Sequence, residues 1–286
     1  MTIEFTSHNI RLDDGTLTKP DAPCTMDAWP WIVSARRILE TIFPGERKHL
    51  RLVDLGCLEG GFAVEFARMG FEVLGIEVRD ANIAACNYVK SKTNLPNLAF
   101  VKDDAWNVRK YGMFDVAFCC GLLYHMDRPK KFLETLSSVT KKLTILQTHF
   151  STHGLGTRLF SPLPTLFKKV LATVTKGRID RYCLSRVTEN EGLVGQWFVE
   201  YKNDKSFSRR ETSKWASWDN RRSFWIQREY LLQAILDVGF DVVMEQFDHL
   251  GPDIAESMLR GYYRTDHRGT FVGIKTKNTL DIPIPG

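Results

Sequence analysis

The sequence predicts an α/β protein with a doubly wound, mainly parallel, seven-stranded sheet and a cap inserted after the fifth strand. Three observations support this class. Short apolar runs alternate with helical patterns from Leu50 onward, as in sheets that helices cover on both faces. A glycine-rich bend, Gly56–Gly61, follows the first run. Segment 151–225 then interrupts this alternation of strands and helices, and its 75 residues are far more than an ordinary connection between elements contains.

The spacing of apolar residues and turn residues predicts each element in order. Residues 5–23 predict a hairpin around Asp14-Gly15, because this dipeptide suits two-residue turns. Apolar positions recur at helical spacing over 32–42. Further helices are expected after the first, second and fourth strands and over 228–238. The seven expected strands are 52–55, 72–76, 98–102, 116–120, 143–147, 241–246 and 271–275.

This pattern divides the chain into three parts. Residues 1–49 are expected to form a hairpin and helix that cover the ligand site. Residues 50–150 and 226–286 are expected to form the ligand-binding core, and 151–225 a substrate-binding cap. We expect such caps to enclose the substrate.

Composition places the protein among ordinary globular chains. Its 286 residues carry a net charge of +5, and segment 151–225 alone has 14 Lys/Arg against 7 Asp/Glu, so the remainder is slightly acidic. No apolar run reaches the ~18 residues that span a bilayer, and the N-terminus lacks the pattern of a secretory signal. The six cysteines lack metal-ligand spacing. We therefore expect a soluble cytoplasmic protein with reduced thiols and no metal site.

Three classes of ligand compete for the glycine bend, since open α/β sheets bind ligands beyond the carboxyl ends of their strands. A nucleoside triphosphate requires Lys-Ser or Lys-Thr after the glycines, and neither follows. A dinucleotide requires G-x-G-x-x-G, whereas Gly56, Gly60 and Gly61 read G-x-x-x-G-G. S-adenosylmethionine has no phosphate, and its ribose diol suits a carboxylate after the second strand. Glu77 is that carboxylate, and Asp54 can orient the loop.

The segment Asp54-Leu55-Gly56-Cys57-Leu58-Glu59-Gly60-Gly61 resembles the first motif of the class I S-adenosylmethionine-dependent methyltransferases. That motif is an acidic residue followed by a G-x-G-like loop. This chain departs from it at Leu58, where many members carry glycine. The resemblance implies a Rossmann-like fold, S-adenosyl-L-methionine as the cofactor and S-adenosyl-L-homocysteine as the product of methylation.

The resemblance continues in order along the chain. Asp103-Asp104-Ala105-Trp106 is similar to the family's adenine-edge segment, with Asp104 as the preferred partner of the exocyclic amine and Asp103 as the alternative. Residues 119–125 are similar to the segment that closes the pocket beneath the methionine part. The cofactor-binding residues that the resemblance implies are Asp54, Gly56, Cys57, Gly60, Gly61, Glu77, Val78, Asp104, Ala105, Gly121 and Leu122.

These residues could instead have purely structural roles, without binding a ligand. Asp54 could brace a turn, and Glu77 could cap the following helix. Gly60 and Gly61 could serve helix packing alone. These alternatives stay open at the level of the sequence.

His125 and His149 are the candidate catalytic bases, because they follow the fourth and fifth strands. Methyl transfer from a sulfonium is an in-line displacement, and a base is useful when the acceptor oxygen or nitrogen must lose a proton. Imidazole suits this task near neutral pH. Either histidine could instead be a wall residue of the pocket.

The cap offers candidate substrate-binding residues. The stretch 214–225 interleaves aromatic and basic side chains, and we expect Trp218, Arg221 and Arg222, together with Tyr124, to contact a small-molecule acceptor. The same surface could bind a nucleic acid instead, by stacking bases and pairing with phosphates. Apolar residues of 163–174 lie at helical spacing, which suggests a lid, core or dimer element, or contact with a membrane surface without stable insertion.

Two other functions remain open. Gly121-Leu122-Leu123-Tyr124-His125, followed by Arg128-Pro129, is similar to a segment of the tRNA wobble-uridine carboxymethyl transferases. Against this, those enzymes have a long domain before the first strand and lack such a cap. The second alternative is a non-catalytic protein of the same fold, acting as a partner subunit or cofactor sensor. The methyltransferase of a small metabolite remains the leading hypothesis.

Overall fold

The structure is a computed structural model that describes residues 3–152, 165–175, 182, 184–248, 254, 256 and 267–276. The chain forms two compact units. The first unit comprises Met1–Cys120, Thr135–Leu146 and Val272–Gly286. The second comprises Gly121–Glu134 and Gln147–Phe271.

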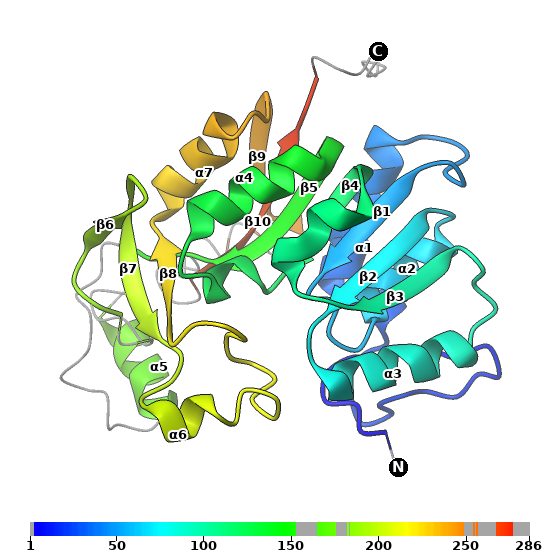
Figure 1. Ribbon diagram of the computed structural model, residues 1–286, viewed down its shortest axis with the longest axis horizontal. Coiled ribbons are helices and arrows are strands. Elements are labelled where there is room, and N and C mark those ends of the chain that lie inside the picture. Colours follow the sequence, from blue (N-terminus) through cyan, green and yellow to red (C-terminus); the bar gives the residue numbers. More distant parts are fainter. Residues whose placement is uncertain are drawn as a thin grey trace. The chain divides into compact units, whose positions relative to one another are not determined.

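The main sheet has seven strands in the order β3-β2-β1-β4-β5-β10-β9 (Figure 1). Strand β1 pairs in parallel with β2 and with β4, and β2 pairs in parallel with β3. This confirms the predicted doubly wound, mainly parallel sheet. The strands are β1 (Arg51–Leu55), β2 (Glu72–Glu77), β3 (Leu98–Lys102), β4 (Phe114–Cys120), β5 (Thr140–His149), β9 (Val242–Gln246) and β10 (Arg268–Ile274).

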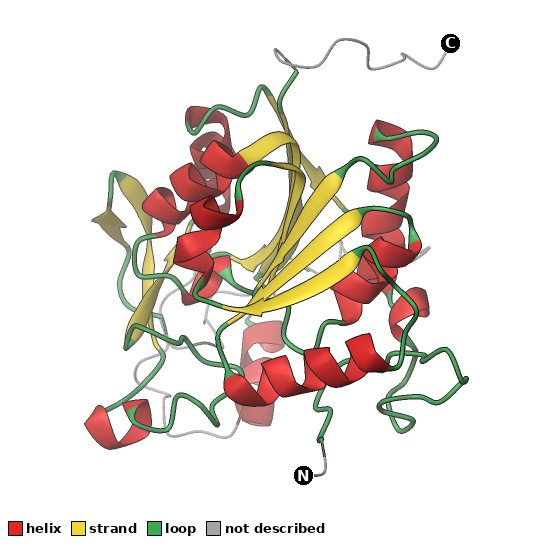
Figure 2. Ribbon diagram, turned by 45° about the vertical axis from the view of Figure 1, so that its right-hand side comes forward, coloured by secondary structure: helices red, strands yellow, loops and turns green. Residues whose placement is uncertain are grey.

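Helices alternate with these strands along the chain (Figure 2). Those before and within this pattern are η1 (Met26–Ala28), α1 (Pro30–Ile42), α2 (Gly61–Arg68), α3 (Asp80–Ser91), η2 (Ala105–Tyr111), η3 (Leu123–His125), α4 (Pro129–Val139) and α7 (Arg228–Asp237). Pro30 occupies the first turn of α1, where its fixed φ suits a helix and its missing N–H costs nothing. Beyond the end of α2, Gly70 adopts a φ of 96°, which is typical of a residue that terminates a helix.

The core of the first unit explains why α2 is apolar on nearly all sides. The helix contacts β1, β2 and α1, and its residues from Gly61 to Ala67 are buried. Phe62 and Phe66 both pack against Phe118 of β4, with ring centroids 4.9 and 4.8 Å apart. This packing holds the start of α2 at the carboxyl end of β1.

The second unit contains a three-stranded antiparallel sheet that the sequence analysis did not predict. Its order is β6-β7-β8, with β6 (Thr188–Asn190), β7 (Leu193–Val199) and β8 (Arg222–Ile226). Strand β8 continues across residue 225, the expected end of the cap. The unit also contains α5 (Thr165–Val174) and α6 (Asp204–Phe207). Helix α5 matches the predicted amphipathic helix, of which residues 163 and 164 lie outside the described residues.

The N-terminal segment differs from the expected hairpin. Within residues 5–23 the hairpin is short: Arg11 and Leu17 form an isolated antiparallel bridge, and backbone hydrogen bonds join Leu12 to Thr16 and Thr18 to Ile10 on either side of it. Gly15 in the turn has the expected positive φ, of 83°. The backbone N–H groups of residues 6–8 donate instead to the side chain of Glu59. The predicted turn is thus present, and a long-range side-chain contact holds residues 6–8, where a longer hairpin was expected.

The described residues contain neither a cluster of metal-binding side chains nor a membrane-spanning helix. No group of three or more His, Cys, Asp or Glu side chains among them is arranged to hold a metal ion. Within the same residues, no helix combines the length and the apolar character needed to cross a membrane.

Candidate cofactor site and histidine cluster

Backbone hydrogen bonds to β2 and within the loop hold the glycine loop between β1 and α2. Gly56 and Cys57 donate their N–H groups to the carbonyl of Ile76 in β2, at 2.9 and 3.1 Å, and Gly60 donates to the carbonyl of Cys57 at 2.8 Å. Gly56 and Gly60 have φ values of 68° and 80°. Leu58 also lies in the left-handed region, with a φ of 52°. The departure from the family motif thus occurs at a position whose backbone favours glycine.

Glu77 ends β2 and ties the loop to helix α3. One carboxylate oxygen accepts N–H groups from Val78 and Arg79, both at 2.9 Å, and the other accepts the N–H of Leu58 at 3.0 Å. The side chain is buried, and burial raises its pKa against the opposing effect of these N–H groups and of the Arg79 charge. These bonds hold the turn that leads from β2 into α3, but both donors precede the helix, which begins at Asp80 without a side-chain cap. The second oxygen of Glu77 can still accept a hydroxyl group, since a carboxylate oxygen has two lone pairs.

Asp54 lies in β1 next to this loop and is 1 % exposed. Its Oδ2 has no hydrogen-bond partner among the described residues. Burial, opposed by the N–H of Ala63 and assisted by the negative charge of Glu77, raises the pKa of Asp54 to about 8. A buried, unpaired carboxyl oxygen beside a second carboxylate suits a cationic ligand. S-adenosylmethionine carries an ammonium and a sulfonium group, so the residues present fit the cofactor that the sequence implied.

Asp103 and Asp104, the two candidates for binding the edge of adenine, differ in the hydrogen bonds that they already accept within the protein. Asp103 accepts hydrogen bonds from Asn107 at one oxygen and from Tyr111 at the other, at 2.6 and 2.8 Å. These contacts outweigh its desolvation and lower the pKa of Asp103 to about 2. Asp104 caps η2 through a 3.0 Å hydrogen bond from the N–H of Trp106. The local bonds of Asp103 favour Asp104 as the partner of an adenine amine.

The remaining loop residues have evident packing roles. The Sγ atoms of Cys57 and Cys86 lie 3.9 Å apart in the buried space between the loop and α3. A Cβ atom on Gly60 would lie 2.6 Å from the ring of Phe100, and one on Gly61 would lie 2.8 Å from His8. Both glycines are thus required by close packing, whether or not they also approach a ligand.

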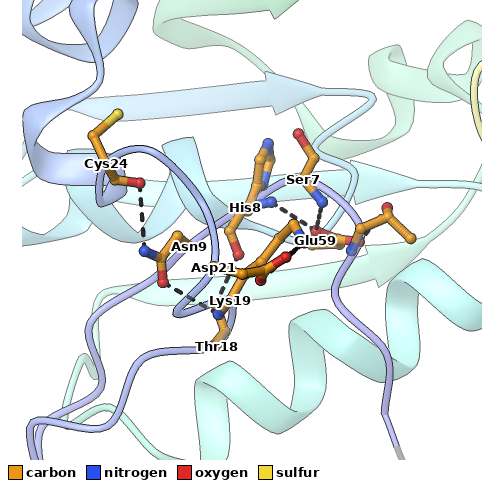
Figure 3. Close-up of polar contacts among 9 residues, drawn as sticks. Ser7, His8, Asn9, Thr18, Lys19, Asp21, Cys24 and Glu59 are labelled. Carbon is orange, nitrogen blue, oxygen red and sulfur yellow. Dashed lines mark hydrogen bonds and ion pairs between the residues drawn. The ribbon is translucent and has the colours of Figure 1, made fainter.

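Two residues that the sequence patterns did not single out hold this loop in place, Glu59 within the loop and His8 in the N-terminal segment. Glu59 belongs to the loop itself, and its carboxylate is surrounded by the N-terminal segment (Figure 3). His8 accepts the N–H of Gly61. An acidic side chain between apolar residues and glycines was the available signal for Glu59. No local signal marked His8, because its partner lies 53 residues away.

In the second unit, His125 pairs with a buried carboxylate. Its Nδ1 lies 2.7 Å from Oε1 of Glu200, whose side chain is 1 % exposed. Glu200 also accepts the hydroxyl of Ser223 at 2.7 Å and the N–H of Ser217 at 3.1 Å. A carboxylate accepts hydrogen bonds, so it favours the His125 tautomer that carries its proton on Nδ1. Nε2 of the neutral ring is then the basic nitrogen.

His149 lies in an aromatic cluster of the same unit. Its Nδ1 is 3.0 Å from the carbonyl of His267, and its ring stacks on Trp225 with centroids 4.8 Å apart and an interplanar angle of 9°. The ring of Tyr124 meets His149 edge-on at 4.6 Å. Because a carbonyl only accepts, Nδ1 of His149 donates and Nε2 is again the basic nitrogen.

Gly121 and Leu122 lie beside these histidines in the chain. Gly121 has a φ of 80° and donates its N–H to the carbonyl of Gln147 at 2.8 Å. Leu122 precedes η3 and accepts the N–H of His125 at 2.9 Å. These bonds fix the turn that presents Tyr124 and His125.

The predicted substrate residues of the cap contact other side chains. Arg221 forms an ion pair with Asp204, and the guanidinium of Arg222 lies 4.1 Å from the centroid of Trp197. The ring of Trp218 lies 4.9 Å from the guanidinium of Arg210. Both Arg221 and Arg222 are exposed. The neighbours that reach the His125 pair are Ser217 and Ser223 instead, so binding of substrate by Trp218, Arg221 and Arg222 stays a prediction.

Known proteins match this chain in sequence and in fold. A family model described as a methyltransferase domain matches residues 32–245. The ubiquinone biosynthesis O-methyltransferase of Acinetobacter baumannii (strain AYE) is 25% identical over 93 residues, which are 32% of this chain and 39% of that protein. The corresponding protein of Albidiferax ferrireducens is 26% identical over 93 residues, 32% of this chain and 37% of that protein. The matched region thus spans about two fifths of the length of these relatives.

Solved structures share the fold over most of the chain. The N-terminal domain of EvdMO1, crystallised in the presence of SAH and D-fucose, superposes with a TM-score of 0.60 at 18% identity, covering 94% of this chain and 90% of that one. The same domain with SAH bound gives a TM-score of 0.57 at 20% identity, covering 86% and 81%. At these identities the likeness establishes the architecture.

Proposed function

This chain belongs to the class I S-adenosylmethionine-dependent methyltransferases, and from this premise we propose that it transfers the methyl group of S-adenosyl-L-methionine to an oxygen or nitrogen of a small-molecule acceptor. S-adenosyl-L-homocysteine is the second product. Oxygen is the preferred acceptor atom, because the two relatives described above are named as ubiquinone biosynthesis O-methyltransferases.

The observation that carries the proposal is the charge at the glycine loop. Asp54 and Glu77 are both buried there, and each carboxyl group raises the cost of ionising the other. Two adjacent acids disfavour the phosphates of a nucleotide and favour a nucleoside that carries positive charge. S-adenosylmethionine has that combination of groups, and its sulfonium supplies an electrophilic methyl carbon.

The residues of the first unit have distinct roles in this proposal. Glu77 accepts a ribose hydroxyl at the oxygen that also binds the N–H of Leu58. Asp104 accepts the adenine amine, and the N–H of Ala105 meets the ring edge. The backbone of Gly56, Cys57, Gly60, Gly61 and Val78 approaches the ligand. Asp54, whose pKa is raised to about 8 by burial, ionises when the cationic part of the ligand lies near it.

Proton removal from the acceptor is assigned to a histidine of the second unit, and His125 is preferred over His149. The Glu200 carboxylate is held by two further donors, so it orients the imidazole and stabilises the imidazolium that forms when Nε2 takes a proton. His149 is held by a neutral carbonyl, which offers less stabilisation to a cation. A base of this kind matches an acceptor hydroxyl, because a hydroxyl must lose its proton as the new bond forms.

The proposal is tested by incubating the purified protein with methyl-labelled S-adenosylmethionine and a panel of small hydroxyl- and amine-bearing compounds. We expect labelled product from at least one hydroxyl compound, together with one S-adenosylhomocysteine per methyl transferred. Binding of S-adenosylhomocysteine without turnover of any compound in a broad panel would argue for a non-catalytic cofactor-binding protein. Failure to bind S-adenosylhomocysteine would contradict the proposal altogether.

A further inference from the structure

We propose that the N-terminal segment Thr6–His8 is an integral part of the cofactor site, in which Glu59 and His8 act as positioning residues for the glycine loop. This inference rests on the proposed function. It extends that function by making cofactor affinity depend on residues that precede the methyltransferase core.

The contacts that join residues 6–8 to Glu59 and Gly61 of the loop are called the clamp here. Its first half is the Glu59 carboxylate. One of its oxygens accepts the N–H and the hydroxyl of Thr6, at 2.6 and 2.7 Å. The other accepts the N–H groups of Ser7 and His8, at 3.1 and 2.9 Å (Figure 3). Three successive backbone N–H groups around one carboxylate make a small anion-binding nest. Glu59 is fully buried, so these donors replace the water that its charge would otherwise require.

The second half of the clamp is the imidazole of His8. Its Nδ1 accepts the N–H of Gly61 at 2.9 Å, and the ring meets Phe62 and Trp29 edge-on at 5.6 and 6.1 Å. Gly61 begins α2, and the first N–H groups of a helix have no partner within it. His8 therefore caps α2. Burial lowers the pKa of His8 to about 4, which keeps the ring neutral and able to accept.

The clamp acts on the ligand-binding part of the loop through one intervening residue. Glu59 is anchored to the N-terminal segment, while the N–H of its neighbour Leu58 donates to Glu77, the proposed ribose ligand. A loop released at Glu59 can rotate about Leu58, whose left-handed backbone is already unfavourable, and withdraw this hydrogen bond. The Glu77 carboxylate would then lose its fixed orientation.

The clamp also accounts for the type of ligand the loop accepts. The N-terminus of a helix ordinarily attracts phosphate through its free N–H groups. Here the N–H of Gly61 is taken by His8, and the Glu59 carboxylate lies on the preceding turn. A phosphate would meet an occupied donor and a negative charge. Glu59 and His8 thus favour a phosphate-free nucleoside over a dinucleotide.

The experiment compares the full-length protein with Glu59→Gln, His8→Leu, His8→Asn and Asp14→Asn by calorimetric titration with S-adenosylhomocysteine. The temperature is one at which circular dichroism shows every variant folded. We expect the dissociation constant to rise about tenfold or more in Glu59→Gln and His8→Leu. His8→Asn should recover most of the affinity, because its amide oxygen can accept the Gly61 N–H. Asp14→Asn is the matched control, since Asp14 is exposed and its side chain accepts the N–H of Thr16 within its own turn.

Folded Glu59→Gln and His8→Leu variants that bind within twofold of the wild type would overturn the inference while leaving the proposed function intact. Wild-type protein that binds no S-adenosylhomocysteine would overturn both. If a variant does not fold, amide hydrogen exchange on the wild type tests the inference instead. We expect S-adenosylhomocysteine to slow the exchange of residues 6–8 together with that of 56–61. Protection of 56–61 alone would contradict the clamp.

Discussion

Asp54 shows how a single buried carboxyl group combines a cost to folding with a use in binding. At 1 % exposure its charged form is poorly solvated, and its Oδ2 has no partner among the described residues. The fold tolerates this because the group is uncharged over much of the neutral range, with its pKa raised to about 8. A cationic ligand would stabilise the charged form instead.

The pH dependence of stability follows from that raised pKa. A carboxyl group whose folded pKa exceeds its unfolded value favours the fold at low pH, and this contribution is lost as pH rises from 3.8 towards 8. We expect the unfolding free energy of the wild type to fall relative to Asp54→Asn by several kcal/mol, at roughly 1.4 kcal/mol per pKa unit, between pH 4 and pH 9. Urea titrations of both proteins without ligand test this. Parallel pH curves would show that Asp54 is ionised without penalty.

Glu200 is the residue through which the proposed base can be tested. Glu200→Gln keeps the size of the side chain and removes the charge that stabilises a protonated His125. We expect kcat to fall by about 100-fold at saturating cofactor and acceptor, within the range for general acid–base catalysis. The affinity for S-adenosylhomocysteine should not change. Glu189→Gln is the control, because Glu189 is an exposed acid on the neighbouring strand β6.

An unchanged kcat in Glu200→Gln would remove the His125 pair from proton transfer. His149→Ala would then become the informative variant, since His149 also presents Nε2 as its basic nitrogen. Loss of turnover in His149→Ala alone would transfer the role to that residue.

At the scale of elements, the β1 to α2 turn depends on glycines for two separate reasons. Gly60 combines a left-handed backbone with a Cβ position that would lie 2.6 Å from the ring of Phe100. Gly45 has a similar backbone, with a φ of 92°, yet nothing lies within 4 Å of its Cβ position. Substitutions at these two glycines therefore distinguish the stability lost to backbone strain from the stability lost to steric crowding.

This contrast gives a stability prediction. Both Gly60→Ala and Gly45→Ala strain the backbone, but Gly60→Ala must also displace the half-buried ring of Phe100, which packs against the core. We expect Gly60→Ala to lower the unfolding free energy by about 1–3 kcal/mol more than Gly45→Ala does. Denaturant titration measures both. Equal losses would mean that the loop can shift away from β3 without cost.

Local patterns predicted the elements of the main sheet well. The apolar runs and the glycine bend were sufficient for β1 and β2, because these strands are mostly buried and read as apolar runs. They were also sufficient for β3, although it is a partly exposed edge strand. The β6-β7-β8 sheet was missed because β6 has three residues and β8 begins with an exposed arginine in a stretch interpreted as a surface. Pairing between β7 and β8 joins segments that are distant in sequence, which no local pattern reports.

For the whole molecule, the family assignment confirms the predicted enzyme class, fold and cofactor. The same comparisons favour neither an RNA-modifying enzyme nor a non-catalytic protein. The sequence pointed to the loop glycines, Glu77 and both histidines from their places after strands. It did not point to Glu200, His8 or the Glu59 contacts, because their roles depend on partners 51 to 75 residues away. Tertiary contacts, rather than motif spacing, determine which nitrogen of each histidine is basic.

The account depends most directly on a nucleoside held at the end of β2 by Glu77. The decisive measurement is the dissociation constant of S-adenosylhomocysteine for the wild type, Glu77→Gln and Glu72→Gln, because Glu72 is the exposed acid at the other end of the same strand. We predict that Glu77→Gln weakens binding by about 2 kcal/mol or more, since a buried charged acceptor is lost, while Glu72→Gln binds as the wild type does. Equal affinities for all three folded proteins would contradict the account.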